Sequence, residues 1–180
     1  MATSMTSPGP RAWSFHPWLW IAAAALLMVP AAAMMLGAPG VAWNAFDFLV
    51  MGALLAAACG LVELGLRAGT GLLYRAAFAL AVVTGFMTVW VNLAVGMLGS
   101  EGHPANLMFG GVLAVAAMGT LLARFRAPAM ALAMAAAGVA QLAAAGVAVA
   151  MGGFQMLEIV LTACFALPWF ASAVLFARST

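Results

Sequence analysis

Six long apolar runs, each close to the thickness of a bilayer, constrain this chain more than any other feature. Short segments that are polar or contain Gly and Pro separate them, and they cover residues 18–36, 42–66, 72–98, 106–123, 129–151 and 154–177. A helix needs about 20 apolar residues to cross the hydrocarbon core. The pattern therefore predicts an all-α membrane protein, a bundle of six transmembrane helices.

The composition agrees with this pattern. Hydrophobic residues make up 68% of the chain and charged residues 6%, whereas an ordinary soluble domain has about a quarter charged residues. A soluble fold could not bury that much apolar surface. We expect a flexible polar tail over residues 1–16 and a single transmembrane bundle over residues 17–178.

The first apolar run has a second interpretation as a cleaved signal peptide. Arg11 would supply the positive n-region, and Ala31–Ala33 after Pro30 would supply a small-residue cleavage site. Cleavage there would leave the orientation of the other five spans unchanged.

The arginines predict how the bundle is oriented. Six spans place both ends of the chain, and the loops after the second and fourth spans, on one side of the membrane. All six arginines fall on that side: Arg11, Arg67, Arg75, Arg124, Arg126 and Arg178. Because short cytoplasmic loops are enriched in basic residues, the N and C termini are predicted to be cytoplasmic.

Two spans carry an acid and an arginine with the same spacing. Asp47 precedes Arg67 by 20 residues, and Glu158 precedes Arg178 by 20 residues. At 1.5 Å per residue this spacing is about 30 Å, the thickness of the hydrocarbon core. We expect each acid at the outer boundary of the membrane and each arginine at the inner boundary.

Polar side chains near the outer ends of the spans are the first candidates for chemistry, because such groups are costly to bury in hydrocarbon. The topology predicts an outer layer of seven: Asn44, Asp47, Asn92, Glu101, His103, Asn106 and Glu158. Carboxylates, amides and a histidine in one layer could bind a cation, a protonated amine or a polar head group, or pass protons. In the alternative interpretation the acids cap helix N-termini and complement the helix dipole.

Other polar residues within the spans favour structural roles. Glu63 and Arg67 have the spacing of an i,i+4 ion pair. Gln141 is expected to form a hydrogen bond between helices. Thr84, Thr88, Asn92 and Gly96 form one i,i+4 stripe that should face other helices, and Asn92 has a second interpretation as part of a substrate or ion site.

No cofactor and no metal site is predicted. Cys59 and Cys164 lie within apolar runs, where we interpret them as small buried packing residues. His16 and His103 fall on opposite sides of the predicted membrane, which argues against a haem held by two histidines. Hydrolase, nucleotide-binding and metalloprotease motifs are absent, and the charge is too sparse for nucleic acid.

One segment resembles a known family. The stretch Val89–Arg126 contains V-W-V-N-x-A-V-G followed by G-x-E-x-x-P-A-N, and WNAFDF stands upstream at Trp43–Phe48. This pattern resembles a family of small multipass bacterial membrane proteins with no assigned activity. The resemblance implies a bacterial inner-membrane protein and marks five family positions: Asp47, Asn92, Glu101, Pro104 and Asn106. His103 occupies a position where the family is variable or Asn-like.

Three functions follow from these observations. The first is a non-enzymatic structural or accessory component that works in the lipid bilayer with other membrane-protein subunits or with copies of itself. The second is a small transporter or channel in which Asp47, Asn92, Glu101 and Glu158 bind a proton or cation. The third is an intramembrane enzyme or redox protein. A watery cavity from the outer acids toward Glu63 would favour transport, and locally paired acids would favour the first function.

Overall fold

The computed structural model describes residues 16–69 and 71–179, all of whose regular elements are helices. Their order is α1 (Pro17–Met35), α2 (Ala45–Ala68), α3 (Leu72–Ala94), the 3-10 helix η1 (Pro104–Leu107), α4 (Met108–Ala123), α5 (Ala127–Met151), α6 (Met156–Cys164) and α7 (Ala166–Ala177). Residues 1–15, which hold Arg11 and nearly all of the predicted tail, lie outside the described residues.

The described residues contain six helical segments that are long and apolar enough to cross a membrane, with η1 and α4 counted as one and α6 and α7 as one. This confirms the predicted fold class. The bounds agree with the apolar runs because, in hydrocarbon, a helix satisfies its backbone hydrogen bonds within its own segment.

The second predicted span begins at Ala45 instead of residue 42, and the third and sixth differ more from the observed helices. The third span ends at Ala94 instead of residue 98, because the chain turns at Gly96 and Gly99, whose φ angles are 78° and 66°. The sixth span is divided at Phe165 into α6 and α7. Pro168 has no N–H with which to bond the carbonyl of Cys164, so the hydrogen-bond ladder is interrupted there.

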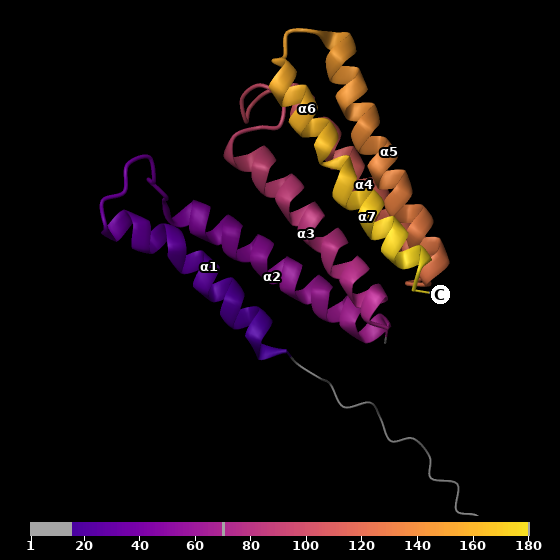
Figure 1. Cartoon of the computed structure of the whole chain (residues 1–180). Helices are drawn as coiled ribbons and strands as arrows, with labels where there is room; N and C mark the ends of the chain where they lie inside the picture. Colours follow the sequence, from indigo (N-terminus) through magenta and orange to yellow (C-terminus); the bar gives the residue numbers. More distant parts are fainter. Residues whose placement is uncertain (1–15, 70, 180) are drawn as a thin grey trace, which may run out of the picture.

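The helices are arranged as a hairpin beside a more tightly packed group (Figure 1). We call α1 and α2 the hairpin, and α3 to α7 with η1 the core. Within the core, α5 packs extensively against both α4 and α7, and α7 packs against α3. The hairpin joins the core where α2 packs on α3, and α1 in turn packs on α2.

The core contains the largest buried side chains, among them Phe109, Trp169 and Phe176. No residue of α1 is buried. Hydrogen bonds from side chains also join the core helices. The Ser172 hydroxyl of α7 donates to the Ala77 carbonyl of α3 at 2.8 Å, and the Tyr74 hydroxyl donates to the Phe125 carbonyl at the same distance.

The arginines of the described region share one end of the molecule. Arg67 and Arg75 flank the α2–α3 connection, Arg124 and Arg126 flank the α4–α5 connection, and Arg178 follows α7. Figure 1 shows the α2–α3 connection and the C-terminal end of α7 at the same end of the bundle. We call this the arginine end, and we call the opposite one, which holds the predicted outer layer, the outer end.

Candidate functional site

Six of the seven residues of the predicted outer layer belong to two separate regions, and the seventh, Asn92, lies on α3. Asn44 and Asp47 lie at the start of α2 in the hairpin, apart from the α3–α4 loop and α6 (Figure 1). Asn44 Oδ1 accepts hydrogen bonds from the backbone N–H groups of Phe46 (2.7 Å) and Asp47 (3.2 Å), and Asp47 Oδ2 accepts from the Asn44 N–H (2.8 Å). The two side chains form a capping box that satisfies the first N–H groups of α2.

Asn106 organises the loop between α3 and α4. Its Oδ1 accepts hydrogen bonds from the N–H groups of Met97 (3.1 Å) and Leu98 (3.0 Å). Its Nδ2 donates to the carbonyls of Leu98 (3.2 Å) and Ser100 (2.8 Å). One amide side chain thus satisfies four backbone groups in the turn that follows α3.

The same loop is also attached to α6. Glu158 Oε2 accepts from the Gly99 N–H at 3.3 Å and from the Gln155 N–H at 3.3 Å, so it both caps α6 and contacts the loop. Thr162 Oγ1 donates to the Met97 carbonyl at 3.2 Å. The contacts of Glu158 with Gly99 and of Thr162 with Met97 are long-range in sequence and hold the outer ends of α3 and α6 together.

His103 and Glu101 complete this region. His103 Nδ1 accepts from the Ala105 N–H at 3.2 Å, and its ring meets Phe154 edge-on with centroids 5.1 Å apart. Glu101 is exposed on the loop. The structure therefore gathers Glu101, His103, Asn106 and Glu158 around one loop, but no three metal-ligating side chains among the described residues are placed to hold an ion.

The α3 stripe forms hydrogen bonds along its own helix. Thr84 Oγ1 donates to the Leu80 carbonyl (2.7 Å), Thr88 Oγ1 to the Thr84 carbonyl (2.8 Å) and Asn92 Nδ2 to the Thr88 carbonyl (2.7 Å). Thr84 and Thr88 are buried, as the stripe predicts. Gly96 is not on this helical face, because it lies in the turn after α3.

Glu63 forms the main polar contact near the arginine end. Arg67 Nη2 lies 2.7 Å from Glu63 Oε2, which is the ion pair that the i,i+4 spacing predicts. Two further donors come from α1 and its N-cap: Trp20 Nε1 at 3.0 Å and the His16 backbone N–H at 3.3 Å, both to Glu63 Oε1. Glu63 therefore ties α1 to α2, a role that the sequence pattern did not predict. The one sign of this role in the sequence is Trp20, whose indole lies close to the start of the first apolar run.

The two cysteines have different surroundings. Cys59 is buried on α2, and its Sγ lies 3.6 Å from the Leu19 carbonyl of α1. Cys164 is exposed, so the prediction that it packs inside the bundle was wrong. It lies at the division between α6 and α7, where Thr162 and Ala166 occupy the buried face.

Gln141 joins α5 to α6. Its Nε2 donates to the Thr162 carbonyl at 2.9 Å, the interhelical hydrogen bond that the sequence predicts. Near Gln141, α5 and α7 approach each other closely at Gly138, where an added Cβ would lie 2.9 Å from the ring of Phe170.

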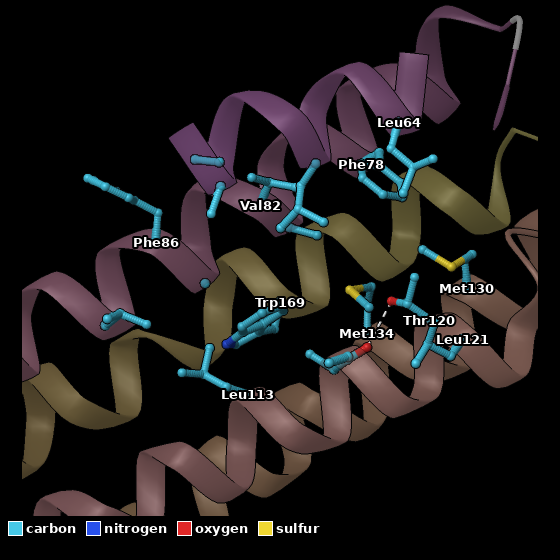
Figure 2. Close-up of a pocket in the computed structure, with 18 of the residues that line it drawn as sticks. Leu64, Phe78, Val82, Phe86, Leu113, Thr120, Leu121, Met130, Met134 and Trp169 are labelled. Atoms are coloured by element: carbon cyan, nitrogen blue, oxygen red, sulfur yellow. Dashed lines mark hydrogen bonds between the residues drawn. The ribbon is translucent and has the colours of Figure 1, made fainter. Parts of the chain in front are cut away.

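A hollow of about 420 Å³ lies between α2 and α4, over α3 and α7. We call it the α2–α4 hollow, and Figure 2 shows ten of its residues labelled. Its lining is Leu54, Ala57, Ala58, Leu61, Leu64, Phe78, Ala81, Val82, Gly85, Phe86, Val89, Leu113, Ala116, Ala117, Thr120, Leu121, Phe125, Met130, Met134 and Trp169. The lining includes neither Glu63 nor any outer acid, so the hollow does not link them. The sequence did not predict the hollow, because its residues resemble those of every other span.

Comparison with protein-family models, with curated proteins and with solved structures finds no match to this chain. The resemblance carried by Val89–Arg126 therefore stays a prediction.

The hydrogen bonds of Asn106 predict that an Asn106→Ala variant loses about 1 kcal/mol of unfolding free energy. The loss stays modest because water can reach this loop and replace some of the lost partners. Unfolding of the detergent-solubilised protein by SDS, followed by circular dichroism, measures it. An Asn106→Asp variant keeps the acceptor for Met97 and Leu98 and should lie closer to the unaltered protein. Equal losses in both variants would show that repulsion between the carboxylate and the carbonyls of Leu98 and Ser100 offsets the acceptor bonds that aspartate keeps.

Proposed function

We propose that this chain is a non-enzymatic component of a membrane complex, placed in a bacterial inner membrane with both termini in the cytoplasm. The observation that carries the proposal is the engagement of the outer polar residues. Asp47 and Glu158 accept backbone hydrogen bonds at helix starts, and Asn106 satisfies the turn after α3. Each of these side chains stabilises the protein's own backbone.

The distribution of polar groups along the bundle supports the same proposal. A proton or cation pathway needs polar side chains or water at intervals across the membrane. Glu63 is bonded to Trp20, His16 and Arg67 at the arginine end. The described lining of the hollow between α2 and α4 is mostly apolar and has no charged side chain.

The hairpin supplies the surface on which a partner would pack. α1 has no buried residue and packs on α2 at the edge of the bundle. It carries runs of alanine at residues 22–25 and 31–33. Small side chains let two helices approach closely in a membrane, where association is driven by van der Waals packing. We therefore infer that the partner packs along α1.

Flux measurements in liposomes test the absence of transport. We expect proton and cation flux with the purified protein to equal that of protein-free liposomes, because the described lining of the hollow has no charged side chain and Asp47 and Glu158 are bonded to backbone groups. An Asp47→Asn, Glu101→Gln double variant serves as the matched sample. If the unaltered protein conducts protons or cations and this variant conducts less, the proposal is overturned in favour of a transporter.

Photo-crosslinking in cells tests the partner. A photoreactive side chain at Ile21 of α1, which is 68% exposed, should yield one discrete adduct. The same side chain at Val139 of α5, 59% exposed, is the control and should yield none. An adduct of twice the chain's 18.3 kDa would identify a second copy, and another discrete mass would identify a different subunit. Absence of any discrete adduct at Ile21 would contradict the proposal.

A further inference from the structure

The α2–α4 hollow exists because small residues stand where the helices face one another. Ala57 and Ala58 contribute from α2, Gly85 from α3, and Ala116 and Ala117 from α4. The two walls, α2 and α4, do not form one of the packed helix pairs of the structure. The gap between them is bridged by α3 and α7, and its α2 and α4 walls belong to candidate membrane-spanning segments.

The lining determines which kind of molecule can fill the hollow. Among its side chains only Thr120 and Trp169 carry a polar atom. Thr120 Oγ1 already donates to the Ala116 carbonyl at 2.8 Å. The indole N–H of Trp169 has no hydrogen-bond partner, but it is buried beneath protein atoms, out of reach of a molecule in the hollow. Figure 2 shows Trp169 between Val82 and Leu113, at the centre of the labelled lining. A water molecule needs two to four polar partners and would find none here.

An empty hollow of this size would also be unfavourable. Side chains that line a void lose the dispersion contacts that packed neighbours provide. A volume of about 420 Å³ falls within the range of ligand-binding cavities, about 300–1,000 Å³. The occupant must therefore be uncharged, apolar and free of groups that require hydrogen bonds.

We propose that the α2–α4 hollow holds an acyl chain of a membrane phospholipid. A hydrocarbon chain is the apolar group that surrounds the bundle at this depth, and it makes no hydrogen bonds. A protein occupant fits less well, because a stable interface buries about 800 Å² on each partner, and the exposed surface of the hollow's lining is well below that area. This proposal is independent of the partner inferred for α1.

Trp169 supplies a direct probe of the occupant. It lines the hollow and is only 2% exposed, so a lipid that stays outside the hollow does not touch it. The experiment uses the full chain with its other five tryptophans, Trp13, Trp18, Trp20, Trp43 and Trp90, replaced by phenylalanine. The protein is reconstituted in phosphatidylcholine vesicles with or without bromine atoms midway along the acyl chains. We expect the brominated lipid to quench Trp169 fluorescence.

A matched pair of variants separates a bound chain from the surrounding bilayer. A leucine side chain at Gly85 would begin within ordinary contact of Leu113 (3.7 Å) and Trp169 (3.8 Å) and would extend into the hollow. A Gly111→Leu variant adds the same volume to α4 where nothing lies within 4 Å. We expect Gly85→Leu to lose at least about half of the quenching, because the added side chain takes the part of the hollow next to Trp169, and Gly111→Leu to keep it.

Three results would overturn the proposal. The first is an absence of quenching in the single-tryptophan protein, which would leave the hollow to a protein helix or to nothing. The second is equal quenching in the Gly85→Leu and Gly111→Leu variants, which would show that the bromines act from the bilayer outside. The third concerns Ala117→Phe, a second variant that adds volume in the hollow and replaces Gly85→Leu if that variant fails to fold. Quenching in Ala117→Phe equal to that in Gly111→Leu would also overturn the proposal. Circular dichroism establishes folding for each sample before quenching is measured.

Discussion

Replacing Glu63 with leucine will loosen α1 from the rest of the bundle more than any other single change considered. The variant leaves Trp20 Nε1, the His16 backbone N–H and Arg67 without the carboxylate that accepts from all three. α1 has no buried residue whose packing could compensate. We expect hydrogen–deuterium exchange of α1 in detergent micelles to become faster by about tenfold or more, with α5 unchanged, because a local opening exposes only the helix that lost its contacts.

Two tryptophan variants provide the controls for this result. Trp20→Phe removes one donor and keeps the aromatic volume, so its effect on α1 exchange should be intermediate. Trp18→Phe makes the same chemical change at a position that is 59% exposed and should have no effect. If α1 exchanges at the same rate in Glu63→Leu and in the unaltered protein, apolar packing alone holds it in place.

The second large effect is expected where α4 meets α5. An added Cβ at Gly119 would lie 2.7 Å from Cβ and 3.2 Å from Cα of Ala133, and neither of these atoms can move without the α5 backbone. Gly119→Ala should therefore lower the free energy of unfolding by about 2 kcal/mol, the usual cost of forcing an extra carbon into a packed core. Unfolding in SDS, followed by circular dichroism, measures the change.

Gly111 provides a control on the same helix. A methyl group added at this position would have no atom within 4 Å, so Gly111→Ala adds volume without a clash. Alanine also favours the helix over glycine by about 1 kcal/mol. Gly111→Ala should be neutral or stabilising. If the two variants behave alike, the α4–α5 interface is looser than the Gly119 and Ala133 distances require.

Several features of the site were predictable because they depend on neighbours in the sequence. The pairing of Glu63 with Arg67 follows from helical spacing, and the capping of α2 and α6 by Asp47 and Glu158 is the alternative given for acids at span starts. Gln141 had to find a partner on another helix, since an amide in hydrocarbon is costly without one.

Other features could not be predicted from local pattern. Asn106 was expected in an outer cluster with Asp47, but it satisfies four backbone groups of its own loop while Asp47 lies in the separate hairpin. Cys164 was expected inside the bundle and faces outward. In each case the outcome depends on which helices become neighbours. A short stretch of apolar residues does not determine which helix will pack against it.

The sequence by itself determined the number of helical spans and, within a few residues, where most of them begin and end. Hydrophobicity and intrahelical hydrogen bonding are properties of each segment alone, so they can be read without knowing the neighbours. Only the tertiary structure decided that the outer acids serve two separate parts of the fold, that Glu63 holds α1, and that α2 and α4 enclose a hollow. These depend on side-chain packing between helices, because lipid tails are as apolar as the helix surfaces and hydrophobicity cannot choose among them.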